Sequence, residues 1–349
     1  MYHFATLFDK NYLTRGLALY SSMNEHIENF TLYILALDNE VVEYVENKNE
    51  DTLKVIKLTD IEKKYPELIE AKNNRSIVEY YFTLSPVLPL YMLETFPEID
   101  FITTLDADIF FFSNPKPIFD KFKNYSILIT KHDFFKELKH LIIYGKYNVS
   151  FQSFRRDKEG FDCLNKWKSQ CLDWCYDILE NDKFADQKYL DTWTSEYENV
   201  LEIAGSGAGI APWNISKYNL SQKKNKFFCN NEELVFYHFH GLRYITKSII
   251  NHGLKAYKVK INKGSKSIYA KYLKKVSALN KEINFTDNNI QRINRSYTKK
   301  ELLHLLIFDH TFFYLLNIHL FEMHLLPVYK VLKYTIFLPL LILKRLFRK

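Results

Sequence analysis

Short apolar runs alternate with amphipathic segments along the first 280 or so residues. Strands are predicted at 4–8, 31–37 and 53–58, with helices at 12–23 and 41–47 between them. This β-α-β-α-β succession predicts a parallel sheet with helices on both faces. The same patterning predicts further strands at 101–114, 125–130, 147–155, 200–204 and 234–239, and helices at 61–74, 77–95, 160–179, from 184 onward and within 255–281.

Proline and the spacing of aromatic residues refine two of these helices. Pro86 and Pro89 lie inside the apolar helix 77–95, so we expect them to kink or split it. In the helix 160–179, Phe161, Trp167 and Trp174 fall on one face, a pattern typical of packing against a core.

Two aspartates, Asp106 and Asp108, flank a single alanine within the apolar stretch Phe101–Asn114, FITTLDADIFFFSN. Most isolated Asp-x-Asp tripeptides are turns or solvated surface. Here the apolar context predicts a buried strand, where carboxylates are costly unless they are paired or bind a metal. Open α/β sheets bind ligands at the carboxyl ends of their strands. A divalent cation that also holds a diphosphate would supply the missing counter-charge.

Three other polar features follow predicted strands and should reach the same edge of the sheet. They are Asp9, the glycine-rich segment 205–214 (GSGAGIAPWN), and the pair His238 and His240. A lone histidine is more often a satisfied core residue. Two carboxylates with a neutral imidazole nevertheless suit Mn²⁺ or Mg²⁺. The glycine spacing does not match the dinucleotide fingerprint GxGxxG.

Composition narrows the class of protein. A chain of 349 residues with 47% apolar and 16% aromatic content can bury one large core or two smaller ones. The net charge of +7 is concentrated at the C-terminus, where the segment from residue 324 onward carries six basic residues and no acid. The remainder is therefore close to neutral, which argues against nucleic-acid binding as a property of the whole domain.

The N-terminal sequence and the cysteines indicate the cellular compartment in which the protein is expected. No basic region followed by an apolar run opens the sequence, so no signal peptide is predicted. The four cysteines, Cys163, Cys171, Cys175 and Cys229, lack CxxC spacing, so we expect reduced thiols in a cytoplasmic protein.

The C-terminal part differs in character from the rest. Residues 286–300 are polar and predicted to be a linker, and 301–349 are predicted to form a basic, amphipathic, helical extension. Its longest run without a charged residue or a histidine, 334–343, is ten residues long, short of the roughly 20 needed to span a bilayer. We expect an interfacial anchor on an anionic membrane. Docking of these helices on the domain or on a second subunit is the alternative.

The order of several short motifs resembles a known group of enzymes. FATLFDKNYL, LDADIFF, YNVSFQSFR, FADQKYLD, GAGIAPWN and HFHGLR follow one another within residues 3–280. In this order they are similar to GT-A-fold glycosyltransferases, in particular glycosyltransferase family 8 and bacterial polysaccharide and lipopolysaccharide glycosyltransferases. The resemblance implies a GT-A domain over 1–285, with a mixed, mostly parallel central sheet flanked by helices, followed by the helical extension.

The resemblance also implies roles for individual residues. Asp106 and Asp108 would be the metal-binding DxD pair for Mn²⁺ or Mg²⁺, with His238 of His-x-x-Gly as the third ligand. The donor would be bound by Phe8, Asp9 and Tyr12 at the base and ribose, by Asn148 beside the sugar, and by Gly241 and Arg243 near the diphosphate. Asp186 and Gln187 match the Asp-Gln pair at the reacting face of the sugar.

The sequence departs from the family pattern at two places. The family's Tyr-x-Arg-Leu is replaced by YYFTLSP, without an arginine, and Arg75 is a candidate substitute. Asn148 is followed by Val149 and Ser150 rather than Ala-Gly. These departures indicate a divergent member.

The resulting hypothesis is a metal-dependent transferase that moves a sugar from a nucleotide-diphosphate sugar to a saccharide or lipid-linked acceptor in surface polysaccharide assembly. The expected reaction retains anomeric configuration, by a covalent intermediate or by same-face attack. The expected location is the cytoplasmic face of the plasma membrane. The alternatives are a catalytically inactive, membrane-associated carbohydrate-binding protein and a sugar-nucleotide nucleotidyltransferase.

Overall fold

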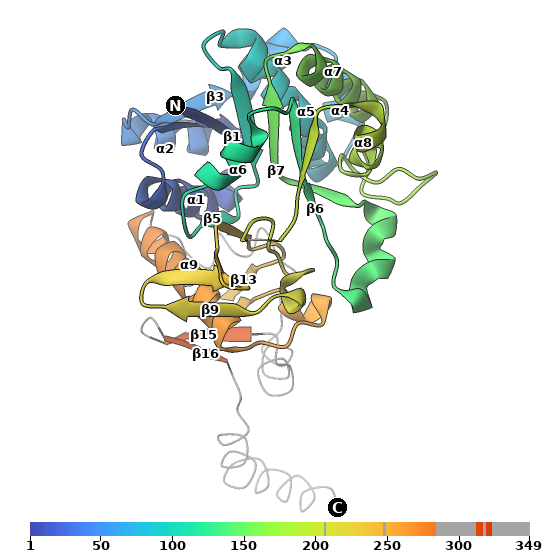
Figure 1. Ribbon diagram of the computed structural model, residues 1–349. Helices are drawn as coiled ribbons and strands as arrows, with labels where there is room; N and C mark the ends of the chain where they lie inside the picture. The colour runs from blue at the N-terminus through green and yellow to red at the C-terminus, as the bar shows by residue number, and fades with distance from the viewer. Residues whose placement is uncertain (206, 247–248, 284–311, 317–318, 323–349) are drawn as a thin grey trace, which may run out of the picture. The chain divides into compact units, whose positions relative to one another are not determined.

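The first apolar run forms β1 (Tyr2–Phe8), around which a seven-stranded sheet is built (Figure 1). On one side β2 (Phe30–Ala36) and then β3 (Leu53–Lys57) join it in parallel, and on the other side β4 (Phe101–Leu105) does so. The helices α1 (Leu13–His26) and α2 (Asn39–Lys48) connect the first three strands. The predicted β-α-β-α-β unit is confirmed.

The other half of the sheet contains its one antiparallel member. β7 (Tyr147–Arg155) lies between β4 and β6 (Ile127–Lys131) and runs opposite to both, while β8 (Val200–Ile203) pairs in parallel with β6. The strand order is β3-β2-β1-β4-β7-β6-β8, which confirms the mixed, mostly parallel sheet. Because β7 is reversed, its first residues lie at the edge where its neighbours β4 and β6 end.

Helices cover both faces of the sheet, and each face has its own hydrophobic core. Alternation along β1 directs Phe4 and Phe8 into one core and Ala5 into the other. The first core is completed by α1, α2 and α6 (Lys116–Phe122). The second is completed by α3 (Leu58–Lys64), α4 (Leu68–Asn74), α5 (Ile77–Thr95), α7 (Lys158–Asp173) and α8 (Trp193–Glu196).

The helix α5 runs unbroken through both of its prolines. It is 19 residues long and contains Pro86 and Pro89, so the expected split is wrong. A proline inside a helix costs about 3 kcal/mol. Residues 86–93 are all buried, and the packing of this half of α5 against the core outweighs that cost. The helix expected from Phe184 is also wrong at its start, because Ala185 has a positive φ of 46°.

Shorter elements complete the structure. They are β5 (Ile109–Phe111), β9 (Leu220–Lys223), β10 (Lys226–Cys229), β11 (Glu232–Glu233), β12 (Phe236–His238), α9 (Lys263–Glu282), and the 3-10 helices η1 (Lys10–Tyr12), η2 (Lys136–Tyr144), η3 (Lys188–Thr192), η4 (Ile215–Lys217) and η5 (Leu254–Tyr257).

This computed structural model describes residues 1–205, 207–246, 249–283, 312–316 and 319–322. The chain divides into two compact units, the first made of 1–240 and 262–283 and the second of 241–261 and 284–349. The first unit takes up most of the expected catalytic domain. The expected linker, 286–300, lies outside the described residues.

The second unit contains a four-stranded antiparallel sheet. Its strands are β13 (Arg243–Thr246), β14 (Ile249–Asn251), β15 (Phe312–Leu316) and β16 (His319–Glu322). The expected C-terminal helix is therefore wrong for β15 and β16, whose aromatic residues favour strands. The rest of 301–349 lies outside the described residues. Within the described part of the chain, no helix is both long and apolar enough to cross a bilayer.

Candidate active site

The two aspartates lie in a turn at the carboxyl end of β4. The expectation of one strand through Phe101–Asn114 is wrong, because β4 ends at Leu105 and β5 belongs to a separate antiparallel pair with β12. The backbone N–H of Asp106 donates to the carbonyl of Ser150 on β7 (2.9 Å), and the N–H of Ile109 closes the turn onto the carbonyl of Asp106 (3.1 Å). The chain then leaves the central sheet.

The pairing of β5 with β12 brings His238 to the aspartates. In this register His238 lies opposite Ile109, the residue after Asp108. The His238 Nε2 atom is 3.0 Å from Asp108 Oδ1 and 3.5 Å from Asp106 Oδ2. His238 and Asp108 are buried, whereas the side chain of Asp106 is 40% exposed. The three sequence-predicted metal ligands therefore form one cluster.

The cluster is electrostatically coupled. Burial opposes ionisation of Asp108, but the adjacent His238 imidazole, with smaller contributions from His240 and Arg15, lowers the pKa of Asp108 to about 2. Burial raises the pKa of Asp106, and the charge of Asp108 raises it further, against the attraction of His238. Burial opposes protonation of His238, but the two carboxylates outweigh it and raise the pKa of His238. The two carboxylates thus favour a positive charge between them, either a proton on His238 or a bound cation.

The geometry of the cluster suits a divalent metal ion. One ligand atom from each of Asp106, Asp108 and His238 lies within 4.8 Å of the others. In an octahedral site with bonds of about 2.0–2.1 Å, neighbouring ligand atoms are about 3 Å apart, close to the measured 3.0 and 3.5 Å. The donor set of two carboxylates and one imidazole fits Mn²⁺ or Mg²⁺ and leaves coordination positions for phosphate oxygens or water.

The glycine-rich segment 205–214 supports His238 from behind. The His238 N–H donates to the carbonyl of Ile210 (2.9 Å), and the Trp213 ring lies edge-on to the imidazole at 5.3 Å. Asn214 is fully buried and clamps the loop: its Nδ2 donates to the carbonyls of His132 (3.0 Å) and Gly209 (2.8 Å), and its Oδ1 accepts from the Ala211 N–H (2.9 Å). The loop thus fixes the orientation of His238, a candidate metal ligand.

A third carboxyl group, that of Asp186, is held by α5. Ser85 on α5 donates to Asp186 Oδ2 (2.5 Å), and the Trp167 indole donates to the Asp186 carbonyl (2.9 Å). Burial raises the pKa of Asp186 to about 7 against the lowering effect of the Ser85 hydrogen bond, and the charge of Asp106 raises it further. Asp186 is therefore close enough to Asp106 for the charges of the two carboxylates to interact.

Gln187 and Asn148 are anchored beside the same sheet edge. The Gln187 amide donates to the carbonyl of Tyr144 (2.8 Å). Asn148, buried near the start of β7, donates to the Thr130 carbonyl (3.2 Å) and accepts from the Ser150 hydroxyl (2.5 Å). The Ser150 carbonyl accepts a hydrogen bond from the Asp106 N–H. Ser150 therefore connects Asn148 to the turn that carries Asp106 and Asp108.

At the end of β1, Asp9 is fixed in place by three donors. Its carboxylate accepts from the Asn11 N–H (3.0 Å), from the Asn11 side chain (2.9 Å) and from the Tyr81 hydroxyl (3.4 Å). Tyr12 is exposed and carries the Arg15 guanidinium 4.1 Å from its ring centre. The Phe8 ring is buried in close contact with Gly16, where a Cβ would lie 2.2 Å from it, so Phe8 belongs to the core.

For three further donor-site candidates, the described residues of the first unit show no contact with the cluster of Asp106, Asp108 and His238. Arg75 donates to the carbonyls of Cys171 (2.6 Å) and Leu172 (2.5 Å) at the end of α7, which gives its guanidinium a structural role. Gly241, with φ of +74°, and Arg243 belong to the second unit.

Sequence reasoning missed Tyr81 and Ser85. The stretch YYFTLSP lacks the arginine of the family motif, and its hydroxyl groups belong to no motif. Tyr81 and Ser85 are four residues apart, so a helix places them on one face, and the structure directs them to Asp9 and Asp186. That spacing was the available signal. The buried Arg15 was missed as well, and no motif marked it.

The comparison with solved structures defines the fold class. The galactosyltransferase LgtC, solved in complex with donor and acceptor sugar analogs, aligns with 79% of this chain and 95% of its own, with a TM-score of 0.51 and 12% identity. At this identity the likeness concerns the fold, and it confirms that the chain has the GT-A fold expected from the sequence.

The comparison with curated sequences then gives the family. The uncharacterized protein YfnF of Bacillus subtilis (strain 168) is 30% identical over 251 residues, which cover 70% of this chain and 82% of YfnF. The uncharacterized protein YfnD of the same strain is 27% identical over 256 residues, which cover 72% of this chain and 81% of YfnD. No protein-family model matches the sequence. The chain belongs to the same protein family as YfnF.

Proposed function

We propose that this protein is a metal-dependent glycosyltransferase that uses a nucleotide-diphosphate sugar as donor. The single observation that supports it best is the cluster of Asp106, Asp108 and His238 at the strand ends of a GT-A fold. A metal held by these three residues would act as a Lewis acid on the diphosphate, where negative charge develops as the sugar leaves.

The protein groups proposed to hold the nucleotide lie at the end of β1. The Asp9 carboxylate, oriented by Asn11 and Tyr81, can accept a hydrogen bond from a base or ribose group. The exposed ring of Tyr12 offers an aromatic surface for the base. The roles that the family resemblance implies for Gly241 and Arg243 toward the leaving diphosphate stay predictions from the sequence. Arg75 is left out because its guanidinium serves α7.

The groups proposed to face the sugar are Asp186, Gln187 and Asn148. With a pKa of about 7, Asp186 can accept or donate a hydrogen bond near neutral pH and so position a sugar hydroxyl or the acceptor hydroxyl. Ser85 fixes the orientation of its carboxyl group. A reaction that retains anomeric configuration remains our proposal for this site.

The experiment is donor cleavage with a panel of nucleotide sugars, in the presence of Mn²⁺, Mg²⁺ or EDTA. We expect metal-dependent release of nucleoside diphosphate. Asp108→Asn should reduce the rate at least a hundredfold and abolish Mn²⁺ binding in calorimetry. Asp120→Asn is the matched control, since Asp120 is an exposed aspartate on α6 that pairs with Lys116. Formation of pyrophosphate from sugar phosphate and nucleoside triphosphate would instead identify a nucleotidyltransferase, and silence with every donor would favour a binding protein.

We also propose that the basic segment 301–349 attaches the enzyme to the cytoplasmic face of the plasma membrane, where it would extend surface polysaccharide or lipopolysaccharide. The support is the sequence: Lys344, Arg345, Arg348 and Lys349 close an apolar stretch without an acid. Full-length protein should sediment with vesicles that contain anionic lipid and not with neutral vesicles. Replacing these four residues by glutamine should release it, and binding that is unchanged by the replacement would contradict the proposal.

A further inference from the structure

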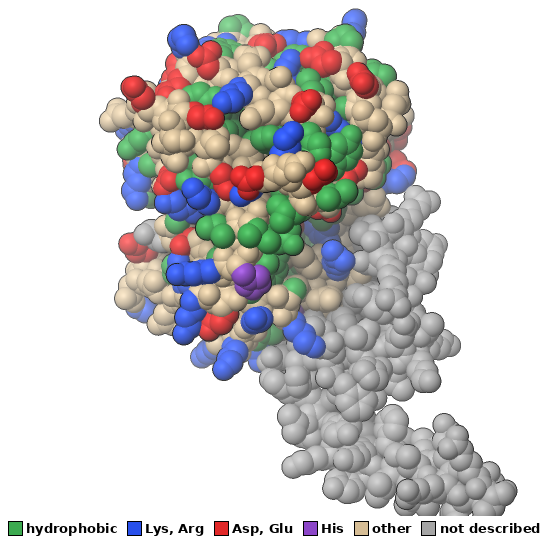
Figure 2. All heavy atoms as spheres, turned by 90° about the vertical axis from the view of Figure 1, so that its right-hand side faces the viewer, with side chains coloured by type: hydrophobic (Ala, Val, Ile, Leu, Met, Phe, Trp, Pro, Cys, Tyr) green, Lys and Arg blue, Asp and Glu red, His purple; other side chains and the backbone are tan. Residues whose placement is uncertain are grey.

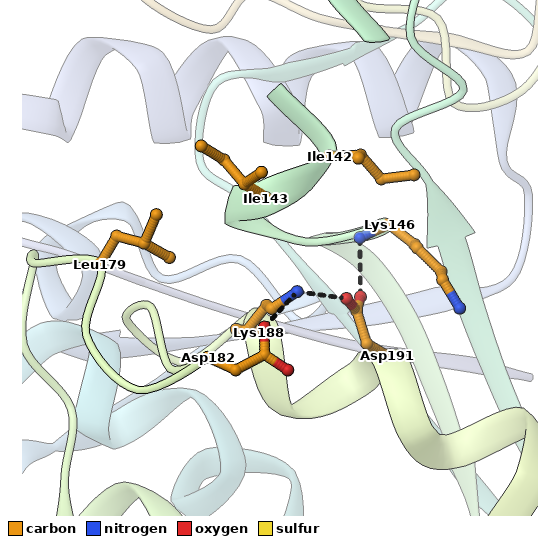
Figure 3. Close-up of a pocket in the computed structure, with 7 residues that line it drawn as sticks. All are labelled: Ile142, Ile143, Lys146, Leu179, Asp182, Lys188 and Asp191. Atoms are coloured by element: carbon orange, nitrogen blue, oxygen red, sulfur yellow. Dashed lines mark hydrogen bonds and ion pairs between the residues drawn. The ribbon is translucent and has the colours of Figure 1, made fainter. Parts of the chain in front are cut away.

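A pocket of about 460 Å³ opens between η2 and the segment 179–191. Three of its lining residues are apolar, Ile142, Ile143 and Leu179 (the apolar wall), and four are charged, Lys146, Asp182, Lys188 and Asp191 (the charged wall). Figure 3 shows the Lys188 ammonium directed between the two carboxylates, with the isoleucines on the neighbouring helical turn. The volume lies in the range of small-molecule sites, about 300–1,000 Å³.

Both walls of the pocket are attached to Gln187. In the charged wall, Lys188 is the residue that directly follows Gln187 along the chain. In the apolar wall, Ile142 and Ile143 directly precede Tyr144, whose carbonyl accepts the Gln187 side-chain amide at 2.8 Å. The intervening Gly145 has φ of +134°, and a Cβ there would be 3.3 Å from the Tyr147 carbonyl oxygen. This tight connection places the pocket next to a residue that we propose to face the reacting sugar.

The charged wall is neutral as a whole and rigid at its centre. Lys188, whose side chain is 10% exposed, lies 2.9 Å from Asp191 Oδ2 and 3.0 Å from Asp182 Oδ1. Asp191 Oδ1 also accepts the backbone N–H of Lys146 (2.7 Å). Two ammonium groups and two carboxylates carry no net charge, while they offer several hydrogen-bond donors and acceptors.

The apolar wall is unusually open to solvent for aliphatic residues. Ile142, Ile143 and Leu179 are 47%, 48% and 41% exposed. Figure 2, which views the side of the first unit that carries η2, shows hydrophobic side chains gathered on this face. Exposed apolar groups that are bordered by polar ones commonly mark a ligand or partner site.

We propose that this pocket binds a neutral saccharide and is the acceptor subsite of the transferase. Saccharides combine hydroxyl groups, which suit the Lys188 and Asp191 pair, with C–H faces, which suit the isoleucines. A lipid tail would desolvate four charged groups, and a phosphate would meet two carboxylates. The identification of the saccharide as acceptor rests on the proposed function.

The test is saturation-transfer NMR on the full-length protein, with methyl glycosides of glucose, galactose, mannose and N-acetylglucosamine as probes. We expect saturation transfer to at least one probe. Ile143→Trp, which fills the pocket from an exposed position, should weaken its binding at least tenfold. Ile178→Trp is the matched control, because Ile178 is 57% exposed and does not line the pocket, and it should bind like the wild type.

If no probe receives saturation from the protein, the proposal is overturned. It is also overturned if Ile143→Trp and Ile178→Trp bind the probe equally well. Donor cleavage by the wild-type protein is measured in parallel. Failure of cleavage alone would remove the transferase and leave the saccharide site standing. Saccharide binding that is insensitive to Ile143→Trp, together with active cleavage, would remove this pocket and leave the transferase.

Discussion

Replacing the buried Asp186 by asparagine should change how the stability of the protein depends on pH. Asp186 is 2% exposed, and burial is the main reason that its pKa is raised to about 7. In the unfolded chain an aspartate titrates near 3.9. The native state therefore binds the extra proton between these values, so this group makes the wild type less stable as the pH rises from about 4 to about 7.

The two pKa values set the size of the effect. With a native pKa of about 7 and an unfolded value of about 3.9, linkage gives a penalty of roughly 1.5 kcal/mol at pH 5 and roughly 4 kcal/mol at pH 8. The difference, roughly 2.5 kcal/mol, should be absent from Asp186→Asn. Asparagine retains an oxygen that can accept the Ser85 hydroxyl, so the replacement removes the ionisation and leaves the shape.

The assay is urea denaturation of both proteins at pH 5 and pH 8, in EDTA and without donor. Between pH 5 and pH 8, the free energy of unfolding of the wild type should fall by roughly 2.5 kcal/mol more than that of Asp186→Asn. The comparison cancels the titration of all groups that the proteins share. If the unfolding free energies of the two proteins change in parallel with pH, the pKa of Asp186 is the same in the folded and unfolded states. The proposal that Asp186 exchanges a proton beside the sugar near neutral pH would then lose its physical basis.

Three further predictions concern the contacts around the site. Ser85→Ala removes a hydrogen bond that lowers the pKa of Asp186, so the same titration should show an additional loss of about 1 kcal/mol at pH 8; an unchanged profile would mean that the hydroxyl does not favour the ionised form. Asn214→Ala breaks three buried hydrogen bonds and should cost about 3 kcal/mol in denaturation, whereas the exposed Asn165→Ala should cost less than about 0.5 kcal/mol; similar losses would refute the clamp. Arg75→Met should lower stability by about 2 kcal/mol while the KM for donor changes less than twofold, and a tenfold rise in that KM at unchanged stability would restore Arg75 to the donor site.

Much of the fold follows from local pattern. The apolar runs that become β1, β2 and β3, separated by amphipathic helices, predict parallel strands because short crossovers leave few other arrangements. The DxD pair and His238 were recognised by their chemistry, since acids and imidazoles that follow apolar strands need a reason to be there. Asp186 and Gln187 came from resemblance to glycosyltransferases, and the role assigned to them stays a prediction.

Other features required the tertiary structure. The partners of Asp186 and Asp9, which are Ser85 and Tyr81, come from a helix that carries no recognisable motif, and only its packing against the sheet directs them. Tertiary contacts also decide the role of Arg75, which was a donor-site candidate because it lies near the position of the missing family arginine. They likewise keep α5 continuous, although its prolines predicted a kink or a split. The local sequence pattern gives the periodicity of apolar residues, which predicts helix or strand, and the chemistry of the side chains. Which side chains meet depends on contacts between segments far apart in the chain, such as β5 with β12, and these form only when the cores pack.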